Sequence, residues 1–414
     1  MAVHVSGMSG NEIWCLQQQR YSPGELVVGN SVVSLGLVGG LVAGVRGVTG
    51  GELGNVTQLI SEGRHLAIER MVKEARDTQA RGVTSVVSEL RSFSGYIEFL
   101  SQGTALMGEG AAPEVPFTTA ASGMELYCHL DAGYHPLKFA MGNVAYALGV
   151  GRSFTGRLRT MARGEIHEFS SMYNNIRHLA LERLQKEAYE AGANAVVDVT
   201  LRLQPFHGIA VELLLTGTAA SHPGLPKPAH AKEVVTSELT GEELWNLAAI
   251  GMVPVQLVMA TSVYSLGLVG GWGSALKGMS RGEIPELTSL VYDARHNCVE
   301  LLRKEAEALG AEQVIGNKLS IREIGDGLIE VMAVGTAVRR AEGVAPATAL
   351  LPPQAIIVER SSLERTFAPV AVAAAAGKPT VSVQSNPLGC LVAALMFGVM
   401  TCFGLFTALL GASH

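Results

Sequence analysis

The chain is poor in charge, and this limits the classes of protein to which it can belong. Asp, Glu, Lys and Arg make up 16% of its 414 residues, against about 25% in an ordinary soluble domain. The net charge of −6 gives no electrostatic reason to expect a nucleic-acid partner. Apolar residues make up 48%, so the chain is core-rich and not disordered.

Paired cysteines are also missing. The five cysteines are scattered, and none forms a CxxC motif, so neither a disulfide framework nor a structural zinc site is indicated. Cys15 and Cys128 occupy the same position of an internal repeat, whereas Asn246 stands there in the third copy. We therefore expect them to be small packing residues in a reducing compartment.

Catalytic constellations are not apparent either. No nucleophile with a partner base and no paired carboxylates recur in register, and the N-terminus lacks the apolar core of a signal peptide. The recurring positions hold glycine, apolar residues, threonine and helix-surface charges, which build folds and contacts. We therefore expect a protein that is not an enzyme and has no cofactor.

What the chain does contain is three copies of one unit. Arg-His, Lys-Glu-Ala and Gly-Thr-Ala each occur three times at nearly constant spacing, and a Gly-Glu and a proline each recur at one position of every copy. Such self-similarity is the mark of repeat architectures. The predicted modules span residues 9–106, 122–220 and 240–339.

Each module is predicted to have the element order α-β-α-β-β. A capping box opens the first helix, with Ser9 and Glu12 in copy 1, and we expect the recurring proline to end this helix. A β-branched strand, a glycine-rich loop and a long amphipathic helix follow. Glycines at 82, 192 and 310 are expected to cap the long helix before a β-hairpin.

The modules resemble a known family. Long helices carrying Lys-Glu-Ala, the run Ala191-Gly192-Ala193-Asn194-Ala195-Val196-Val197, and hairpins ending in Gly-Thr-Ala are similar to the YbjQ-like proteins, often labelled heavy-metal-binding. The resemblance implies a dodecin-like or related α/β fold that assembles as a ring, typically a homopentamer. The fold class is thus α/β (α+β), in three tandem YbjQ-like modules.

A histidine that recurs once in each module is the best metal candidate. Imidazole suits Zn, Ni or Cu, and the three positions are His65, His178 and His296. Each module also places a glutamate one helical turn later (Glu69, Glu182, Glu300). A structural His-Glu hydrogen bond therefore explains the pattern equally well.

The glycine-rich loops suggest contact with lipid. Apolar loops can enter a membrane interface, and basic side chains can pair with lipid phosphates. The candidate residues are Leu37, Val38, Leu41, Val42, Arg46, Arg152, Arg157, Arg159, Leu268, Val269, Trp272 and Lys277. The alternative is that the apolar loops pack inside an oligomer while the arginines face water.

A run of 23 uncharged residues, 388–410, lies near the C-terminus. An apolar helix of this length spans about 30 Å of hydrocarbon, and the alternative is a buried core helix. The predicted anchor residues are Leu388, Leu391, Leu395, Phe397, Phe403, Leu405, Phe406 and Leu409. Residues 340–387, rich in Ala and Pro, would tether this single-pass anchor to modules that face the cytoplasm.

Together these features predict a membrane-anchored structural protein that assembles with itself, as a pentamer or a multiple of one, and scaffolds or encloses membrane lipid. Two other functions fit the same residues. One is a sensor that binds a metal or a small ligand between modules, and the other is a tail-anchored adaptor for a protein partner.

Overall fold

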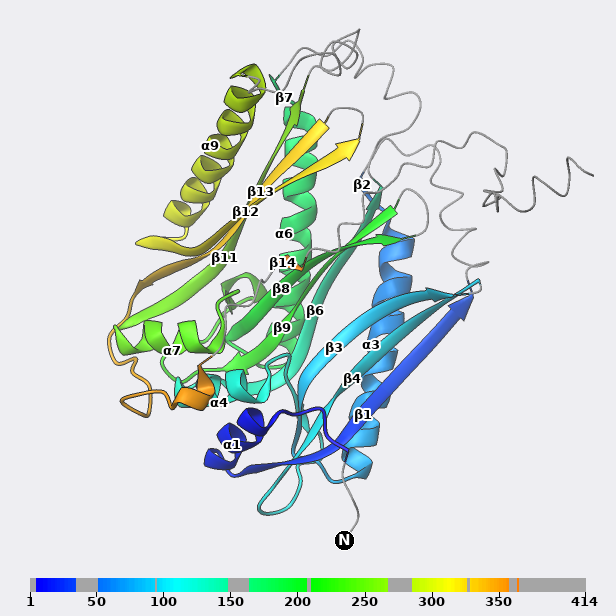
Figure 1. Cartoon of the computed structure of the whole chain (residues 1–414), viewed down its shortest axis with the longest axis vertical. Coiled ribbons are helices and arrows are strands. Elements are labelled where there is room, and N and C mark those ends of the chain that lie inside the picture. Colours follow the sequence, from blue (N-terminus) through cyan, green and yellow to red (C-terminus); the bar gives the residue numbers. More distant parts are fainter. Residues whose placement is uncertain are drawn as a thin grey trace, which may run out of the picture. The chain divides into compact units, whose positions relative to one another are not determined.

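Each of the three modules folds as a short helix, a long strand, a long helix and a β-hairpin (Figure 1). The structure is a computed structural model that describes residues 5–34, 51–93, 95–147, 164–206, 210–266, 285–325, 328–356 and 363–364. The predicted order α-β-α-β-β is therefore confirmed over these residues.

The elements have the following bounds. Module 1 contains α1 (Gly10–Gln18), β1 (Tyr21–Ser34), β2 (Gly51–Glu52), α3 (Gly54–Asp77), β3 (Gly82–Phe93) and β4 (Tyr96–Gly108). Module 2 contains β5 (Phe117–Thr118), α4 (Gly123–Asp131), β6 (His135–Ala147), β7 (Gly164–Glu165), α6 (His167–Glu190), β8 (Ala195–Phe206) and β9 (Ala210–Ser221). Module 3 contains η1 (Ala231–Glu233), β10 (Val235–Thr236), α7 (Gly241–Ala249), β11 (Met252–Ser265), α9 (Pro285–Ala308), β12 (Gln313–Gly325) and β13 (Leu328–Arg340), followed by η2 (Pro353–Ala355) and β14 (Leu363–Glu364).

Every module builds one antiparallel sheet from its long strand and its hairpin, and each sheet also includes a strand from a neighbouring module. The sheet orders are β1-β4-β3-β5, β10-β8-β9-β6-β2 and β12-β13-β11-β7, with β14 added beside β8. Thus β5 and β10 pair with the hairpin of the preceding module, while β2 and β7 pair with the long strand of the following one. Consecutive modules are therefore bound to each other at both edges.

The short helices begin where the sequence predicts but end differently. Ser9, Ser122 and Thr240 each form a complete capping box. The recurring proline does not end the helix. It lies inside the next strand, and in each module the strand register shifts just after it. A residue without an N–H is tolerated there because a bulge interrupts the ladder.

The long helices end in left-handed residues at one repeated position. Gly192 and Gly310 have φ of 78° and 68°, as predicted. In module 1 the position is held by Gln79 with φ of 58°, so the prediction that Gly82 caps this helix is wrong. Gly82 instead begins β3, where a Cβ would meet the Phe117 ring at 2.3 Å.

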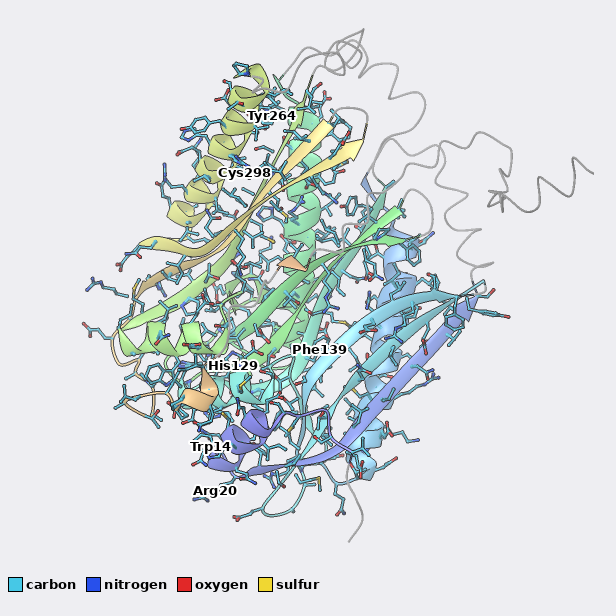
Figure 2. All side chains as sticks on the ribbon, viewed as in Figure 1. Trp14, Arg20, His129, Phe139, Tyr264 and Cys298 are labelled. Carbon is cyan, nitrogen blue, oxygen red and sulfur yellow. The ribbon has the colours of Figure 1, made fainter. Side chains whose placement is uncertain are left out.

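The apolar core runs across module boundaries. One buried cluster joins Phe169 and Tyr173 of α6 to Met259 and Val263 of β11. Another contains Tyr264 of β11 and Cys298 of α9, which lie in the same part of module 3 (Figure 2). The modules therefore share core and do not behave as beads on a string.

Among the described residues, no helix is both long enough and apolar enough to span a membrane. The predicted anchor at 388–410 lies outside the described residues.

Candidate functional site: the joint between modules

The most elaborate site is the contact between consecutive modules, which we call the joint. It consists of the long helix of one module packed on the long strand and hairpin of the next: α3 on β6 and β9, and α6 on β11 and β13. Its first contact is a two-residue strand. Gly51 and Glu52 pair with Ala147 and Tyr146 at the first joint, and residues 164–165 pair likewise with 264–265 at the second.

A hydroxyl then extends this pairing from the helix. The N–H of Leu53 donates to the carbonyl of Ala145 at 2.8 Å, and the N–H of Ala145 donates to Thr57 Oγ1 at 2.9 Å. The second joint repeats both bonds, with Val263 as the strand residue and Ser170 as the hydroxyl at 2.9 Å. The outer edge of β6 or β11 is thus satisfied by the preceding helix.

A buried ion pair lies at the centre of the first joint. Arg64 donates from Nε and from its terminal nitrogen to the two carboxylate oxygens of Glu212, at 3.0 and 2.7 Å. Arg64 also donates to the carbonyl and the hydroxyl of Ser88. Both charged side chains are at most 1% exposed, and a bidentate, fully hydrogen-bonded geometry is what burial of two charges requires.

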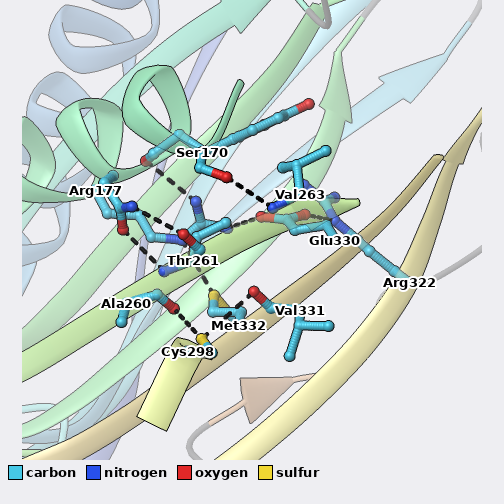
Figure 3. A network of polar contacts seen from close by, with 12 residues as sticks. Ser170, Arg177, Ala260, Thr261, Val263, Cys298, Arg322, Glu330, Val331 and Met332 are labelled. Carbon is cyan, nitrogen blue, oxygen red and sulfur yellow. Dashed lines mark hydrogen bonds and ion pairs between the residues drawn. The ribbon is translucent and has the colours of Figure 1, made fainter. Parts of the chain in front are cut away.

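The second joint contains the same pair with one more cation (Figure 3). Arg177 and Arg322 each pair with one carboxylate oxygen of Glu330, and Arg177 also donates to the Tyr173 carbonyl at 3.1 Å. Burial alone would raise the pKa of Glu330, but the two guanidinium groups hold that pKa below its usual value. Glu330 is therefore a buried carboxylate anion bridging two modules.

Two of the three recurring histidines belong to the same joints. His65 Nε2 lies 3.3 Å from Glu187 of module 2, and His178 Nε2 lies 3.1 Å from Glu305 of module 3. The hydrogen bond with the glutamate is the main cause that raises the pKa of each histidine. Each Nδ1 lies within hydrogen-bond distance of the carbonyl four residues earlier.

The proposed pairing of each histidine with a glutamate four residues later is therefore wrong for His65 and His178. Their hydrogen-bonded partners come from the next module, because the helix face that carries the histidine is turned toward that module. Among the described residues no group of three or more His, Cys, Asp or Glu side chains is placed to hold a metal ion. A histidine with one carboxylate supplies only two ligands, fewer than zinc sites use.

The short helices form a row beside the joints, with α4 packed between α1 and α7. The N–H of Gly123 donates to Glu12 Oε1 at 3.1 Å, and a Cβ at Gly123 would lie 2.7 Å from the Glu12 Cβ. Trp245 Nε1 donates to Asp131 Oδ2 at 2.7 Å. Cys15 and Cys128 are fully buried, and burial raises the pKa of both thiols, so their predicted packing role is confirmed.

The terminal modules expose the halves of a joint that the inner ones bury. Val32 of β1 is 50% exposed, whereas Ala145 and Val263 at the same repeat position are fully buried. Arg295 of α9 is exposed, whereas Arg64 and Arg177 are at most 1% exposed. One half-joint therefore lies open at each end of the row of modules.

The structure does not bring the three repeated histidines together: His65 and His178 lie at the same place on the two joints, and His296 is exposed on α9. The predicted lipid-contact residues, between 37 and 46, 152 and 159, and 268 and 277, lie outside the described residues. Sequence reasoning missed the glutamate partner of the buried arginine. The signal was present, since Glu98, Glu212 and Glu330 each stand five residues before the repeated Gly-Thr-Ala.

The three similar modules of the structure agree with the family that the sequence matches. The family described as "Putative heavy-metal-binding", the YbjQ-like family, matches residues 17–109, 134–222 and 249–341. These segments make up more than half of the chain. The chain belongs to this family.

Several relatives are similar to this YbjQ-like protein. An encapsulin nanocompartment protein of Mycobacterium tuberculosis is 29% identical over 237 residues, which is 55% of this chain and 87% of that protein. A UPF0145 protein of Methanoregula boonei is 41% identical over 83 residues, 20% of this chain and 69% of its own length. Another, of Paraburkholderia phymatum, is 38% identical over 97 residues, 23% of this chain and 83% of its own. The last two align over about the length of one module, and the first over more than one.

Proposed function

We propose that this protein is a non-enzymatic structural protein whose chains assemble with one another, and that the assembly scaffolds or encloses membrane lipid. The observation that carries the proposal is the joint. It occurs twice inside the chain with the same ion pair, histidine contact and strand pairing between modules. One half of it is exposed at each end of the row of modules. A buried ion pair with edge-strand pairing is a contact suited to permanent assembly and not to turnover of a substrate.

The relative named as an encapsulin nanocompartment protein supports an enclosing role, because a compartment is built from many chains of its components. The uncharged run 388–410 supports attachment to a bilayer. Several anchors in one assembly would hold far more firmly than one, since their binding is multivalent.

The native mass of detergent-extracted full-length protein tests assembly. Light scattering is expected to give a discrete multiple of the 43.5 kDa chain mass, with five chains being the number that the family resemblance implies. Electron microscopy of the same sample should show one closed or extended object. A single chain at micromolar concentration would overturn the proposal.

Truncation after Pro387 tests the anchor separately. The truncated chain is expected to stay in the supernatant when membranes are pelleted, while the full-length chain pellets. A truncated chain that still pellets would contradict the anchor and would direct attention to Arg46, Arg157 and Lys277 among the predicted lipid-contact residues.

A further inference from the structure

We propose that the tail of one chain docks on the head of a second copy through a third joint, built like the two internal ones. This inference rests on the proposed self-assembly, and it identifies the two surfaces through which the chains would bind each other. The tail face is α9 with Arg295 and His296, together with the outer edge of β12. The head face is the outer edge of β1 with Glu98 and Glu74, together with residues 5–8 and α1.

The charged groups of the two faces are complementary in register. Glu98 stands at the repeat position of Glu212 and Glu330, opposite Val32 of β1 just as Glu212 lies opposite Ala145. It is half-buried and accepts only a 3.2 Å hydrogen bond from Asn30 among the bonds found in the described residues. Arg295 stands at the position of Arg64 and Arg177, so docking would give Glu98 the arginine that its two counterparts have.

The new joint would resemble the second one most closely. Arg91 lies across the strand pair from Glu98, as Arg322 lies across from Glu330. Docking of Arg295 would therefore place the Glu98 carboxylate between two guanidinium groups. His296, exposed on α9, would meet Glu74, which is the counterpart of the histidine partners Glu187 and Glu305.

The exposed strand edges of the two faces indicate the same docking, independently of charge. In module 2, β5 pairs with the hairpin of the preceding module while its continuation binds the threonine of its own Gly-Thr-Ala, through the Ala120 N–H to Thr218 at 3.0 Å. Residues 5–8 lie in the same way in module 1, with the Gly7 N–H donating to Thr104 at 3.3 Å. Val5 is 66% exposed, and β12 is an edge strand of its sheet. Edge strands readily accept such additions.

The row of short helices gives a third argument for this docking, which is steric. A Cβ built at Gly123 or Gly241 would lie 2.7 Å from the preceding helix, whereas at the equivalent Gly10 nothing lies within 4 Å. The aromatic side chains show the same difference. Trp14 is 37% exposed, and its counterparts Tyr127 and Trp245 are 6% exposed. An α7 from another chain would cover both Gly10 and Trp14.

A second chain is required because the two faces point away from each other. β1 and α9 lie at opposite ends of the row of modules (Figure 1), so one chain cannot close the joint on itself. The contact is heterologous, tail to head. Such contacts generate closed rings where the rotation closes and filaments where it does not.

The experiment measures protein mass by light scattering on detergent-extracted full-length protein. Arg295→Glu and Glu98→Arg are each expected to reduce the mass to that of one chain, because each variant places like charges together. The double variant Arg295→Glu/Glu98→Arg restores opposite charges and is expected to restore the wild-type mass. Lys304→Glu is the matched control on α9, since its counterpart Lys186 remains 70% exposed beside an internal joint.

Gly10→Leu tests the steric contact without altering charge. Its side chain has room in a single chain, so circular dichroism and thermal unfolding should match those of a chain carrying Arg295→Glu, while assembly is lost. If the wild type is itself a single chain, both self-assembly and this joint are refuted. If the wild type assembles and Arg295→Glu and Gly10→Leu both keep its mass, self-assembly stands and this joint is refuted.

Discussion

Arg64 of module 1 and Glu212 of module 2 form two hydrogen bonds inside a joint that leaves both side chains at most 1% exposed. The two residues are 148 positions apart in the sequence, so this pair reports directly on how modules are held together. Removing one partner leaves the other charge buried without its counterion, which costs about 3–5 kcal/mol. We therefore expect Arg64→Met to lower the free energy of unfolding by about this amount in urea denaturation.

The double variant Arg64→Met/Glu212→Leu provides the control. With no charge left to bury, it should regain most of the loss, as replaced buried pairs often do. The exposed pair of Lys186 with Glu190 offers the contrast, since Lys186→Ala should cost only about 0–1 kcal/mol. Equal losses for Arg64→Met and Lys186→Ala would show that the joint is hydrated or open.

The histidines of the joints predict a pH dependence with a definite sign. His65 and His178 have pKa values raised mainly by hydrogen bonds with Glu187 and Glu305. A group whose pKa is raised on folding stabilises the fold fully below its unfolded pKa of about 6.5, and this contribution is lost as the pH rises through the folded value.

The joints should therefore weaken as the pH rises above the unfolded pKa of about 6.5 and through the raised folded values. Because both histidine side chains are more than a third exposed, solvent screening keeps the effect small. Thermal unfolding of the wild type and of His65→Gln/His178→Gln at several pH values isolates it. The difference between the two proteins should shrink with increasing pH, and a difference that grows would contradict the assignment.

The repeat, the element order and the capping boxes could be predicted because they depend on local residue patterns that recur in all three copies. The prediction for the end of the short helix is wrong because Pro23 is as compatible with a strand beside a bulge as with the end of a helix. The joint could not be predicted from one module's pattern. The burial of Arg177 and the exposure of Arg295 depend on whether a further module packs on the helix that carries them. The residues that flank each arginine do not predict this.

The recurring threonine of Gly-Thr-Ala ties each module to its own leading segment. Thr218 Oγ1 lies 2.8 Å from the buried Thr119 hydroxyl and accepts from the part-buried Ala120 N–H. Thr218→Val would remove the partner of both groups, at a total cost of about 1–3 kcal/mol. Thr218→Ser keeps the hydroxyl and should cost clearly less in the same denaturation experiment. Equal costs would mean that the methyl group, and not the hydroxyl, matters at this position.

Thiol reactivity can report on the third joint. Cys15 and Cys128 are fully buried, with pKa values raised by burial, and each unit of such a shift lowers the thiolate fraction about tenfold. Both should resist iodoacetamide at a pH of about 8 until the protein unfolds. Asn246 is exposed at the same repeat position, so Asn246→Cys creates a thiol that the described residues of its own chain leave accessible.

Alkylation of the thiol introduced by Asn246→Cys, read by peptide mass spectrometry, should be fast in a chain that also carries Arg295→Glu and slow in the assembled protein. Cys128 in the same sample is the internal reference for a buried thiol in the row of short helices. Equal, fast alkylation of the introduced thiol in both proteins would mean that no second chain covers α7, even where light scattering finds an assembly. Protection that appears only with assembly would place the head of one chain on the tail of the next, because module 1 of the same chain lies at the other end of the row (Figure 1).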